Sequence, residues 1–322
     1  MDGILNVLKP PGMTSFDVVA LLRGMFGTKK IGHAGTLDPL AAGVLPVCLG
    51  KATKAIEFMM EKDKFYRAEL TLGVTTDTQD STGKTLSLAE PECTDEDIRK
   101  AVSSFVGRYL QLPPMYSALR IDGKRLYDLA REGAEVERER REVMIYSADV
   151  VDIDRSDMLR VLIDVHCSKG TYIRTLCADI GDLLGCGGHM SFLLRKRAGP
   201  FDIAFAVTLE ELERLKKDGS LGSALLAADT VFLQYESYTL NEKEEKKFRN
   251  GVEIDIGRSP GPAGPVACEK ETAGRASVPD GNGQGIDSHT VRVYGASGEF
   301  IALGTVRGTE DTWRMKVKKF FI

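Results

Sequence analysis

Gly-His-Ala-Gly-Thr-Leu-Asp-Pro-Leu-Ala-Ala-Gly-Val-Leu-Pro-Val occupies residues 32–47 and is the most informative stretch of the chain. Glycines and prolines interrupt any helical or strand period, so the spacing predicts a long loop over Lys29–Pro46 that leads into a buried strand, Val44–Leu49. Long ordered loops inside a domain are often functional. The loop carries one carboxylate, Asp38, which is either a turn residue before Pro39 or a catalytic group on a rigid seat.

The segment before this loop has clear start and stop signals. Ile4–Leu8 is typical of a short buried strand, and the Pro-Pro-Gly run at 10–12 ends it. Thr14 or Ser15 can cap a helix with a regular apolar face, and Gly27 is placed to end it.

Downstream, strand and helix patterns alternate. Alternation predicts a strand at Lys64–Val74 and a hairpin of Val143–Ile153 with Met158–Cys167. Helical patterns begin after capping residues or run to a glycine: Thr94 with Asp97 through Phe105, Thr171–Leu184 before Gly185, and Thr208 with Glu211. This order predicts an α+β or α/β catalytic domain with a mixed sheet.

The composition changes near residues 225–235, where we expect the domain boundary. A polar helix is predicted at Asn241–Asn250, and three strand-like runs follow at 291–294, 300–306 and 313–321, as in a small β module. Between them, residues 258–288 are rich in proline and glycine and are predicted to be a flexible insertion. The expected domains are therefore residues 1–228, catalytic, and residues 229–322, a β module.

Composition excludes several classes of protein. No run of about eighteen apolar residues and no leader at Met1–Leu8 is present, so we expect a soluble, cytoplasmic chain without a membrane segment. Six cysteines without a CxxC pair favour reduced, mostly buried thiols, and four histidines without HxxH spacing disfavour a metal site. A formal net charge of −4 argues mildly against nucleic acid as a partner.

The stretch around Asp38 resembles the signature loop of the TruB family of pseudouridine synthases. The similarity extends over most of residues 3–205, at Ile4–Gly12, Lys64–Arg67, Gly73–Asp80, Met115–Leu119 and Cys167–Thr175. The resemblance implies a tRNA-modifying isomerase that converts the uridine at position 55, in the T-loop, to pseudouridine. It also implies that no cofactor is needed and that Asp38 is the catalytic carboxylate, by attack or by proton relay.

The resemblance assigns roles to two further catalytic residues. Arg174 is implied to pair with Asp38 and to keep its pKa low; the alternative is a surface arginine of the helix, but a cation in the first turn is unfavourable for the helix dipole, which favours the pairing. Tyr66 is implied to stack on the uracil with its hydroxyl near C5. Because Phe65 and Tyr66 point to opposite faces of one strand, we expect Tyr66 on the wetter face, where its hydroxyl finds a partner.

A uridine stacked inside a folded loop must be flipped out before it can react. His33 matches the family residue that fills the space it leaves, and Lys9 and Leu193 match positions that support the loop and the base. Lys9 and Leu193 could equally be structural, and for His33 metal ligation is the weaker alternative.

Two basic segments are implied to bind phosphates. One is an RNA-gripping insertion at about residues 115–142, with Arg120, Lys124, Arg125, Arg131, Arg138, Arg140 and Arg141. The other is Arg195-Lys196-Arg197, where the chain has Leu194-Arg195 instead of the two adjacent arginines usual in the family. The C-terminal strands resemble a PUA module, with Lys316, Lys318 and Lys319 near its end.

Two other functions compete with this interpretation. A tRNA-folding chaperone would bind the T-arm and elbow without chemistry, but it has no evident reason to combine Asp38, Tyr66 and Arg174. An RNA-guided dyskerin-type synthase would usually carry extra terminal segments and protein partners. We expect instead a stand-alone enzyme, monomeric and without an obligatory protein partner.

Overall fold

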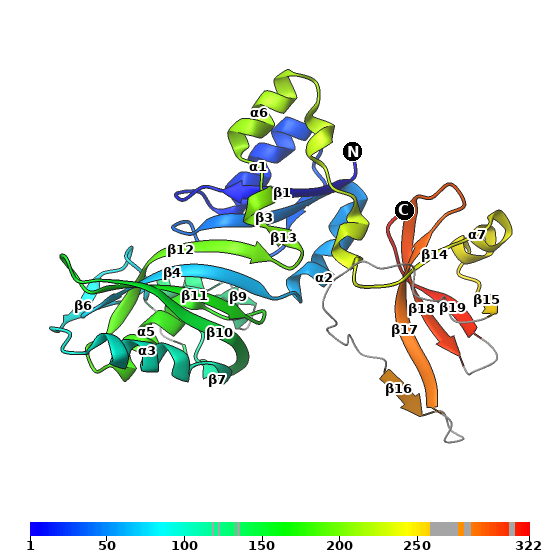
Figure 1. Ribbon diagram of the computed structural model, residues 1–322. Coiled ribbons are helices and arrows are strands. Elements are labelled where there is room, and N and C mark those ends of the chain that lie inside the picture. Colours follow the sequence, from blue (N-terminus) through cyan, green and yellow to red (C-terminus); the bar gives the residue numbers. More distant parts are fainter. Residues whose placement is uncertain are drawn as a thin grey trace. The chain divides into compact units, whose positions relative to one another are not determined.

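The computed structural model describes residues 1–117, 119–121, 123–131, 133, 136–257, 276–279, 285–308 and 313–322. The chain has a mixed α+β architecture, and its strands and helices are labelled in Figure 1. It divides into two compact units. The larger unit comprises Leu5–Cys48 and Ile56–Ala224, and the smaller comprises Met1–Ile4, Leu49–Ala55 and Leu225–Ile322.

A nine-stranded mixed sheet is the framework of the large unit. Its strands lie in the order β1 (Gly3–Lys9), β3 (Ala42–Leu49), β12 (Gly188–Ala198), β4 (Lys64–Leu72), β11 (Arg160–Cys167), β10 (Arg141–Asp154) and β7 (Gly107–Gln111), with β2 (Ile31–His33) on β3 and β13 (Phe201–Asp202) on β12. β3 and β12 are parallel, whereas β12, β4, β11, β10 and β7 pair antiparallel in turn. The predicted hairpin of β10 and β11 is confirmed.

The principal helices of the large unit either begin after the predicted capping residue or end where the sequence predicts. They are α1 (Ser15–Phe26), α3 (Asp95–Ser104), α5 (Ile173–Leu183) and α6 (Leu209–Lys217), with the shorter α2 (Ile56–Met60) and α4 (Leu126–Arg131). Thr14, Thr94 and Thr208 form reciprocal capping boxes. Gly27 ends α1 with a left-handed φ of 62°, as its position predicts.

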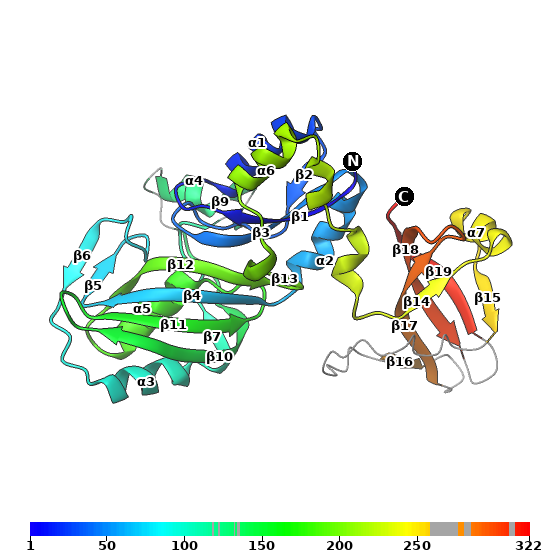
Figure 2. The same cartoon turned by 45° about the horizontal axis from the view of Figure 1, so that its top comes forward.

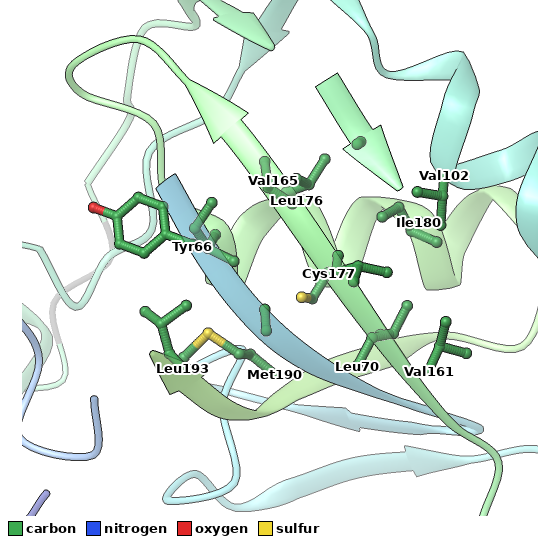
Figure 3. Packing of buried hydrophobic residues seen from close by; sticks show 14 of the residues in the cluster. Tyr66, Leu70, Val102, Val161, Val165, Leu176, Cys177, Ile180, Met190 and Leu193 are labelled. Carbon is green, nitrogen blue, oxygen red and sulfur yellow. The ribbon is translucent and has the colours of Figure 1, made fainter. Parts of the chain in front are cut away.

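The core of the large unit lies between the sheet and the helices α3 and α5 (Figures 1 and 3). Along most of β4 the side chains alternate, so Ala68 and Leu70 are fully buried while Arg67 and Glu69 are partly exposed, and at its end Thr71 and Leu72 are both buried. Val161 of β11 and Ile180 of α5 complete the same cluster. This packing fixes α5, and with it every residue of its first turn, against the sheet.

The smaller unit contains a six-stranded sheet (Figure 2). Its elements are β14 (Ser237–Thr239), α7 (Glu242–Arg249), β15 (Ile254–Gly257), β16 (Ala276–Pro279), β17 (Gly285–Tyr294), β18 (Phe300–Gly308) and β19 (Trp313–Phe320). Phe248 of α7 packs on Val291 and Val293 of β17, which are fully buried. The predicted β module with a preceding capped helix is confirmed.

Several elements were not predicted from the sequence. They include β2 within the expected loop, β7, β12, and the hairpins β5 (Val74–Thr76) with β6 (Thr85–Leu88) and β8 (Arg120–Ile121) with β9 (Lys124–Arg125). In the expected insertion, residues 276–279 form β16 and residues 285–288 begin β17, while 258–275 and 280–284 lie outside the described residues.

The remaining composition-based expectations concern cysteines and membrane segments. Cys48, Cys93, Cys167, Cys177 and Cys186 are free thiols, four of them buried, and Cys268 lies outside the described residues. Among the described residues, no helix combines the length and apolar character needed to cross a membrane.

Candidate active site

The loop that carries Asp38 connects β2 to β3. Its first anchor is the segment from Gly12 to Ser15. Ser15, the first residue of α1, accepts a hydrogen bond from the Leu37 amide at 2.9 Å and donates to the Leu37 carbonyl at 3.2 Å. The Gly12 amide donates to the Pro39 carbonyl at 2.8 Å. These bonds hold both neighbours of Asp38, so its backbone is fixed on either side.

Lys9 is a second anchor, at the end of β1. Its ammonium is fully buried and donates to the carbonyls of Pro10, Met13 and Pro39 at 2.9, 2.6 and 3.4 Å. Burial lowers the pKa of Lys9 to about 8, and the nearby charge of Asp38 opposes that shift. Lys9 therefore joins the Pro-Pro-Gly turn to the loop of Asp38.

Arg195, in the middle of β12, is the third anchor. It is 1% exposed, and its guanidinium donates to the carbonyls of Val44, Gly35 and Thr36 at 2.7, 3.0 and 3.5 Å. Its backbone lies against Gly43, where φ is 115° and a Cβ would be 2.3 Å from the Arg195 carbonyl oxygen. Glycine is therefore required at position 43 for β3 and β12 to meet in this register.

Arg174, in the first turn of α5, contacts Asp38 directly. Its Nε is 2.9 Å from Oδ2 of Asp38, and its Nη2 is 3.4 Å from Oδ1. Nη1 faces a second carboxylate, that of Asp80, at 3.4 Å, and the carbonyls of Thr78 and Tyr116 accept at 3.2 and 2.8 Å. The predicted pairing of Arg174 with Asp38 is present, and it is part of a larger network.

The two carboxylates of this network differ in exposure. The side chain of Asp38 is 36% exposed, whereas those of Arg174 and Asp80 are 6% and 7% exposed. Asp80 accepts further hydrogen bonds from Thr78 and Thr82, including one from the Thr82 amide at 3.0 Å. Asp38 is thus the carboxylate that an incoming molecule can reach, and Asp80 holds the opposite edge of Arg174.

Burial raises the pKa of the Asp38 carboxyl above its ordinary value, and the nearby Asp80 adds to this effect. Arg174 and Lys9 oppose it by stabilising the ionised form. The sequence predicts only the effect of Arg174, because the loss of hydration depends on how the folded chain surrounds the carboxyl.

Tyr66 lies on the buried face of β4, not on the wetter one. It is 9% exposed and belongs to the same cluster as Leu37 and Leu193, while Phe65 is on the half-buried opposite face. The expectation for its environment was therefore wrong. In Figure 3 the Tyr66 ring lies at the edge of the cluster beside Leu193, with its hydroxyl directed away from the packed side chains. Burial raises the pKa of Tyr66.

His33 ends β2 and is half-buried. Its Nδ1 is buried without a hydrogen-bond partner, and burial together with the charge of Arg195 lowers its pKa, so the imidazole is neutral at pH 7. The described residues contain no group of three or more His, Cys, Asp or Glu side chains that could hold a metal ion. His33 is thus a polar ring with an unused acceptor or donor next to the loop.

Comparison with known proteins places this arrangement in a family. Residues 23–173 match the TruB family pseudouridylate synthase N-terminal domain, and residues 174–232 match the tRNA pseudouridylate synthase B C-terminal domain. A tRNA pseudouridine synthase B of Clostridioides difficile (strain 630) is 41% identical over 325 residues, with all of both chains covered. The chain belongs to the TruB family.

Further similarities agree with this assignment. A tRNA pseudouridine synthase B of Alkaliphilus oremlandii (strain OhILAs) is 50% identical over 254 residues, covering 79% of this chain and 83% of the relative. A chain in the crystal structure of a Cbf5-Nop10-Gar1 complex superposes with a TM-score of 0.68 at 26% identity, covering 99% of this chain and 85% of that one. The TruB fold thus accounts for the mixed sheet.

The basic run 195–197 of this TruB chain is not one cluster. Arg195 is buried in the anchor described above, Lys196 contacts Asp164 at 3.2 Å and lies over the Phe65 ring, and only Arg197 is exposed. The expectation of three phosphate-binding cations was wrong, because the register of β12 against β4 shifts between Arg195 and Arg197, which leaves Arg195 buried and Arg197 exposed although they lie two positions apart.

The predicted RNA-gripping segment is only partly described. Positions 118, 122, 132, 134 and 135 lie outside the described residues, and the side chains of Arg120, Lys124, Arg125 and Arg131 are not described either. Arg138 and Arg140 donate to the carbonyls of Pro113 and Leu110 at 2.9 and 3.1 Å, and Arg141 is exposed.

Sequence reasoning missed two residues of the TruB site, Asp80 and Arg195. Asp80 lies in the stretch Gly73–Asp80 that resembles the family, but no role was expected for it. A buried arginine commonly has more than one acidic partner, because its charge must be compensated. For Arg195 only part of the signal was available: alternation places it on the same face as Leu193, but it places Arg197 there too, and only the structure shows the register shift that separates Arg195 from Arg197.

Proposed function

We propose that the protein converts the T-loop uridine at position 55 of tRNA to pseudouridine, with Asp38 as the catalytic carboxylate. Membership of the TruB family and relatives named tRNA pseudouridine synthase B support a tRNA pseudouridine synthase, an isomerase. The observation that supports the assignment to Asp38 is its contact with Arg174 at 2.9 Å on a loop anchored from three sides.

The reaction breaks the bond from ribose C1′ to uracil N1, turns the base and joins C1′ to C5, whose proton then moves to N1. The substrate and product have the same atoms, so no oxidant or reductant takes part. Asp38 must be ionised whether it attacks or relays a proton, and Arg174 favours that form inside a desolvated site.

Tyr66 and Leu193 are proposed to hold the flipped base. Both belong to the core cluster that also contains Leu37 of the Asp38 loop, and the Tyr66 hydroxyl is directed away from the packed side chains (Figure 3). In this proposal the ring stacks on uracil and the hydroxyl acts near C5. Lys9 is proposed to hold the loop of Asp38 in place. Its three bonds to carbonyls, one of them to Pro39 of this loop, agree with that role.

His33 is proposed to occupy the space that the flipped nucleotide leaves in the T-loop. A neutral imidazole with an unpaired Nδ1 suits this role, because it can both stack on bases and accept or donate one hydrogen bond. The partner is thus the T-arm and elbow of tRNA.

The rest of the RNA is proposed to contact residues 115–142, Arg197 and the C-terminal unit, taken as a PUA-like domain spanning residues 229–322. Arg314, Lys316 and Lys318 alternate along β19 and are exposed, so they form one basic face. We further propose that the enzyme acts as a cytoplasmic monomer, without guide RNA, metal, cofactor or obligatory protein partner.

A modification assay tests this function. Unmodified tRNA transcript is incubated with the parent protein and with Asp38→Asn, and pseudouridine is mapped at single-nucleotide resolution. The expected result is one modified T-loop uridine with the parent and background levels with the variant, while both bind tRNA. A folded Asp38→Asn protein that modifies tRNA at the parent rate would overturn the role of Asp38. Refolding of tRNA without any modification by the parent would support the chaperone instead.

A further inference from the structure

The start of α5 lacks a cap of its own. Tyr172 is the N-cap residue, and its side chain makes no capping hydrogen bond. The first turn contains no acidic residue but does contain Arg174, whose positive charge is unfavourable at the positive end of the helix dipole. Contacts from outside the helix must therefore hold this end in place.

Gln111, the last residue of β7, supplies such a contact. Its side chain is 1% exposed, its Oε1 accepts from the Tyr172 amide at 2.7 Å, and its Nε2 donates to the Tyr172 carbonyl at 2.9 Å. The two bonds engage both backbone groups of one residue, as a neighbouring strand would. Leu176 also donates to the Tyr172 carbonyl at 3.1 Å, so the Tyr172 amide is the group that depends on Gln111.

The chain after Gln111 runs to the guanidinium of Arg174. Pro113 and Pro114 follow, both buried and each with a restricted φ, and the Tyr116 carbonyl then accepts from Nη2 of Arg174 at 2.8 Å. Gln111 thus joins the backbone two residues before Arg174 to the segment that binds its guanidinium.

We propose that Gln111 is a positioning residue, which sets the guanidinium of Arg174 against Asp38 by holding the first turn of α5 in register with residues 112–117. It does not touch the reacting atoms. This inference rests on the proposed function, because it assigns Gln111 a part in the ionisation of Asp38.

Tyr109, on the same strand, provides the matched control. Its hydroxyl bonds to Asp179, farther along α5, so it attaches the same helix to the same strand at a point away from Arg174. The Tyr109 hydroxyl also interacts with the Gln111 side chain, but its loss leaves both bonds from Gln111 to Tyr172 in place, so it weakens the docking of α5 while the first turn stays held.

The test compares Gln111→Met, Gln111→Asn and Tyr109→Phe with the parent, by single-turnover rates across pH, tRNA affinity and thermal unfolding. For Gln111→Met we expect a rate about 10-fold to 100-fold lower at unchanged tRNA affinity. We also expect the acidic limb of its pH–rate profile at higher pH, because a displaced Arg174 stabilises ionised Asp38 less. Gln111→Asn, which is too short to reach both groups, should change both quantities in the same direction.

Tyr109→Phe should lose thermal stability while keeping the parent rate and pH profile. If the Gln111 variants lose stability but keep the parent rate, or lose rate without a shift of the acidic limb, the proposal is overturned. Should Gln111→Met not fold, Gln111→Asn decides by the same two readouts. A parent protein without modification activity would contradict the proposed function and not the role of Gln111.

Discussion

Arg174 places its Nε 2.9 Å from Asp38 while Asp80 holds its Nη1 at 3.4 Å. Removal of Asp38 therefore does not leave a buried cation without a partner. We expect Asp38→Asn to unfold at the same temperature as the parent at pH 7, or slightly above it, because burial disfavours the lost charge. Thermal unfolding measures this, and a large decrease in the variant would contradict the role given to Asp80.

Replacement of Arg174 should change the pH dependence of the reaction. Arg174 lowers the pKa of Asp38, which burial has raised, so Arg174→Met moves that pKa further up. Because the ionised form reacts, the acidic limb of the pH–rate profile should shift to higher pH. The free energy of unfolding should change in the matching direction. A carboxyl whose pKa is raised in the folded state stabilises the fold less as pH rises through that pKa. Arg174→Met, in which this pKa is higher still, should therefore lose more free energy of unfolding than the parent between pH 4 and neutral pH.

Single-turnover rates and thermal unfolding, both measured across pH, check this prediction. Arg174→Lys keeps the positive charge but not the several N–H donors of the guanidinium. Compared with Arg174→Met, it should shift the acidic limb of the pH–rate profile less and lose a similar amount of rate. An unchanged limb in Arg174→Met would separate this residue from the ionisation of Asp38.

Tyr66→Phe should retain tRNA binding and lose about 100-fold to 10,000-fold in turnover, because stacking remains while the hydroxyl is gone. Phe65→Leu is the control on the same strand, since its ring lies on the opposite face beside His166. It should change stability alone. A near-normal single-turnover rate in Tyr66→Phe would exclude an acid–base role for this hydroxyl.

Arg195 and Arg197 lie two positions apart on β12, but their substitution should have different effects. Arg195→Met leaves three carbonyls without their donor, at a cost of about 1–3 kcal/mol for each one that stays unsatisfied, and it loosens the loop of Asp38. We expect a lower unfolding free energy and a lower rate, with the salt dependence of tRNA binding unchanged.

Arg197→Met should show the opposite pattern. Its side chain is exposed, so its loss should weaken tRNA binding, reduce the salt dependence by about one phosphate contact and leave the saturated rate intact. Filter binding at several salt concentrations, together with saturated rates, distinguishes the two. Equal effects of both substitutions on salt dependence would restore the interpretation of one basic cluster.

Local signals predicted the helices well, since Thr14, Thr94 and Thr208 each bond within their own first turn. The pairing of Asp38 with Arg174 followed from family resemblance, because no local pattern joins residues 136 positions apart. Alternation showed that Phe65 and Tyr66 face opposite sides of β4, but not which side is buried. That choice depends on α5 and on Leu193, which the sequence alone does not place.

The bond from Arg195 to the Gly35 carbonyl spans 160 positions in the chain. At a synthesis rate of about 5–20 residues per second, residue 35 leaves the ribosome about 8–32 s before the residue that fixes it. The loop that carries Asp38 is therefore made early and completed late. During this interval a growing chain already carries Asp38 and the start of the sheet without an aligned site, so the loop of Asp38 takes its final form only after residue 195 of the 322 has been made.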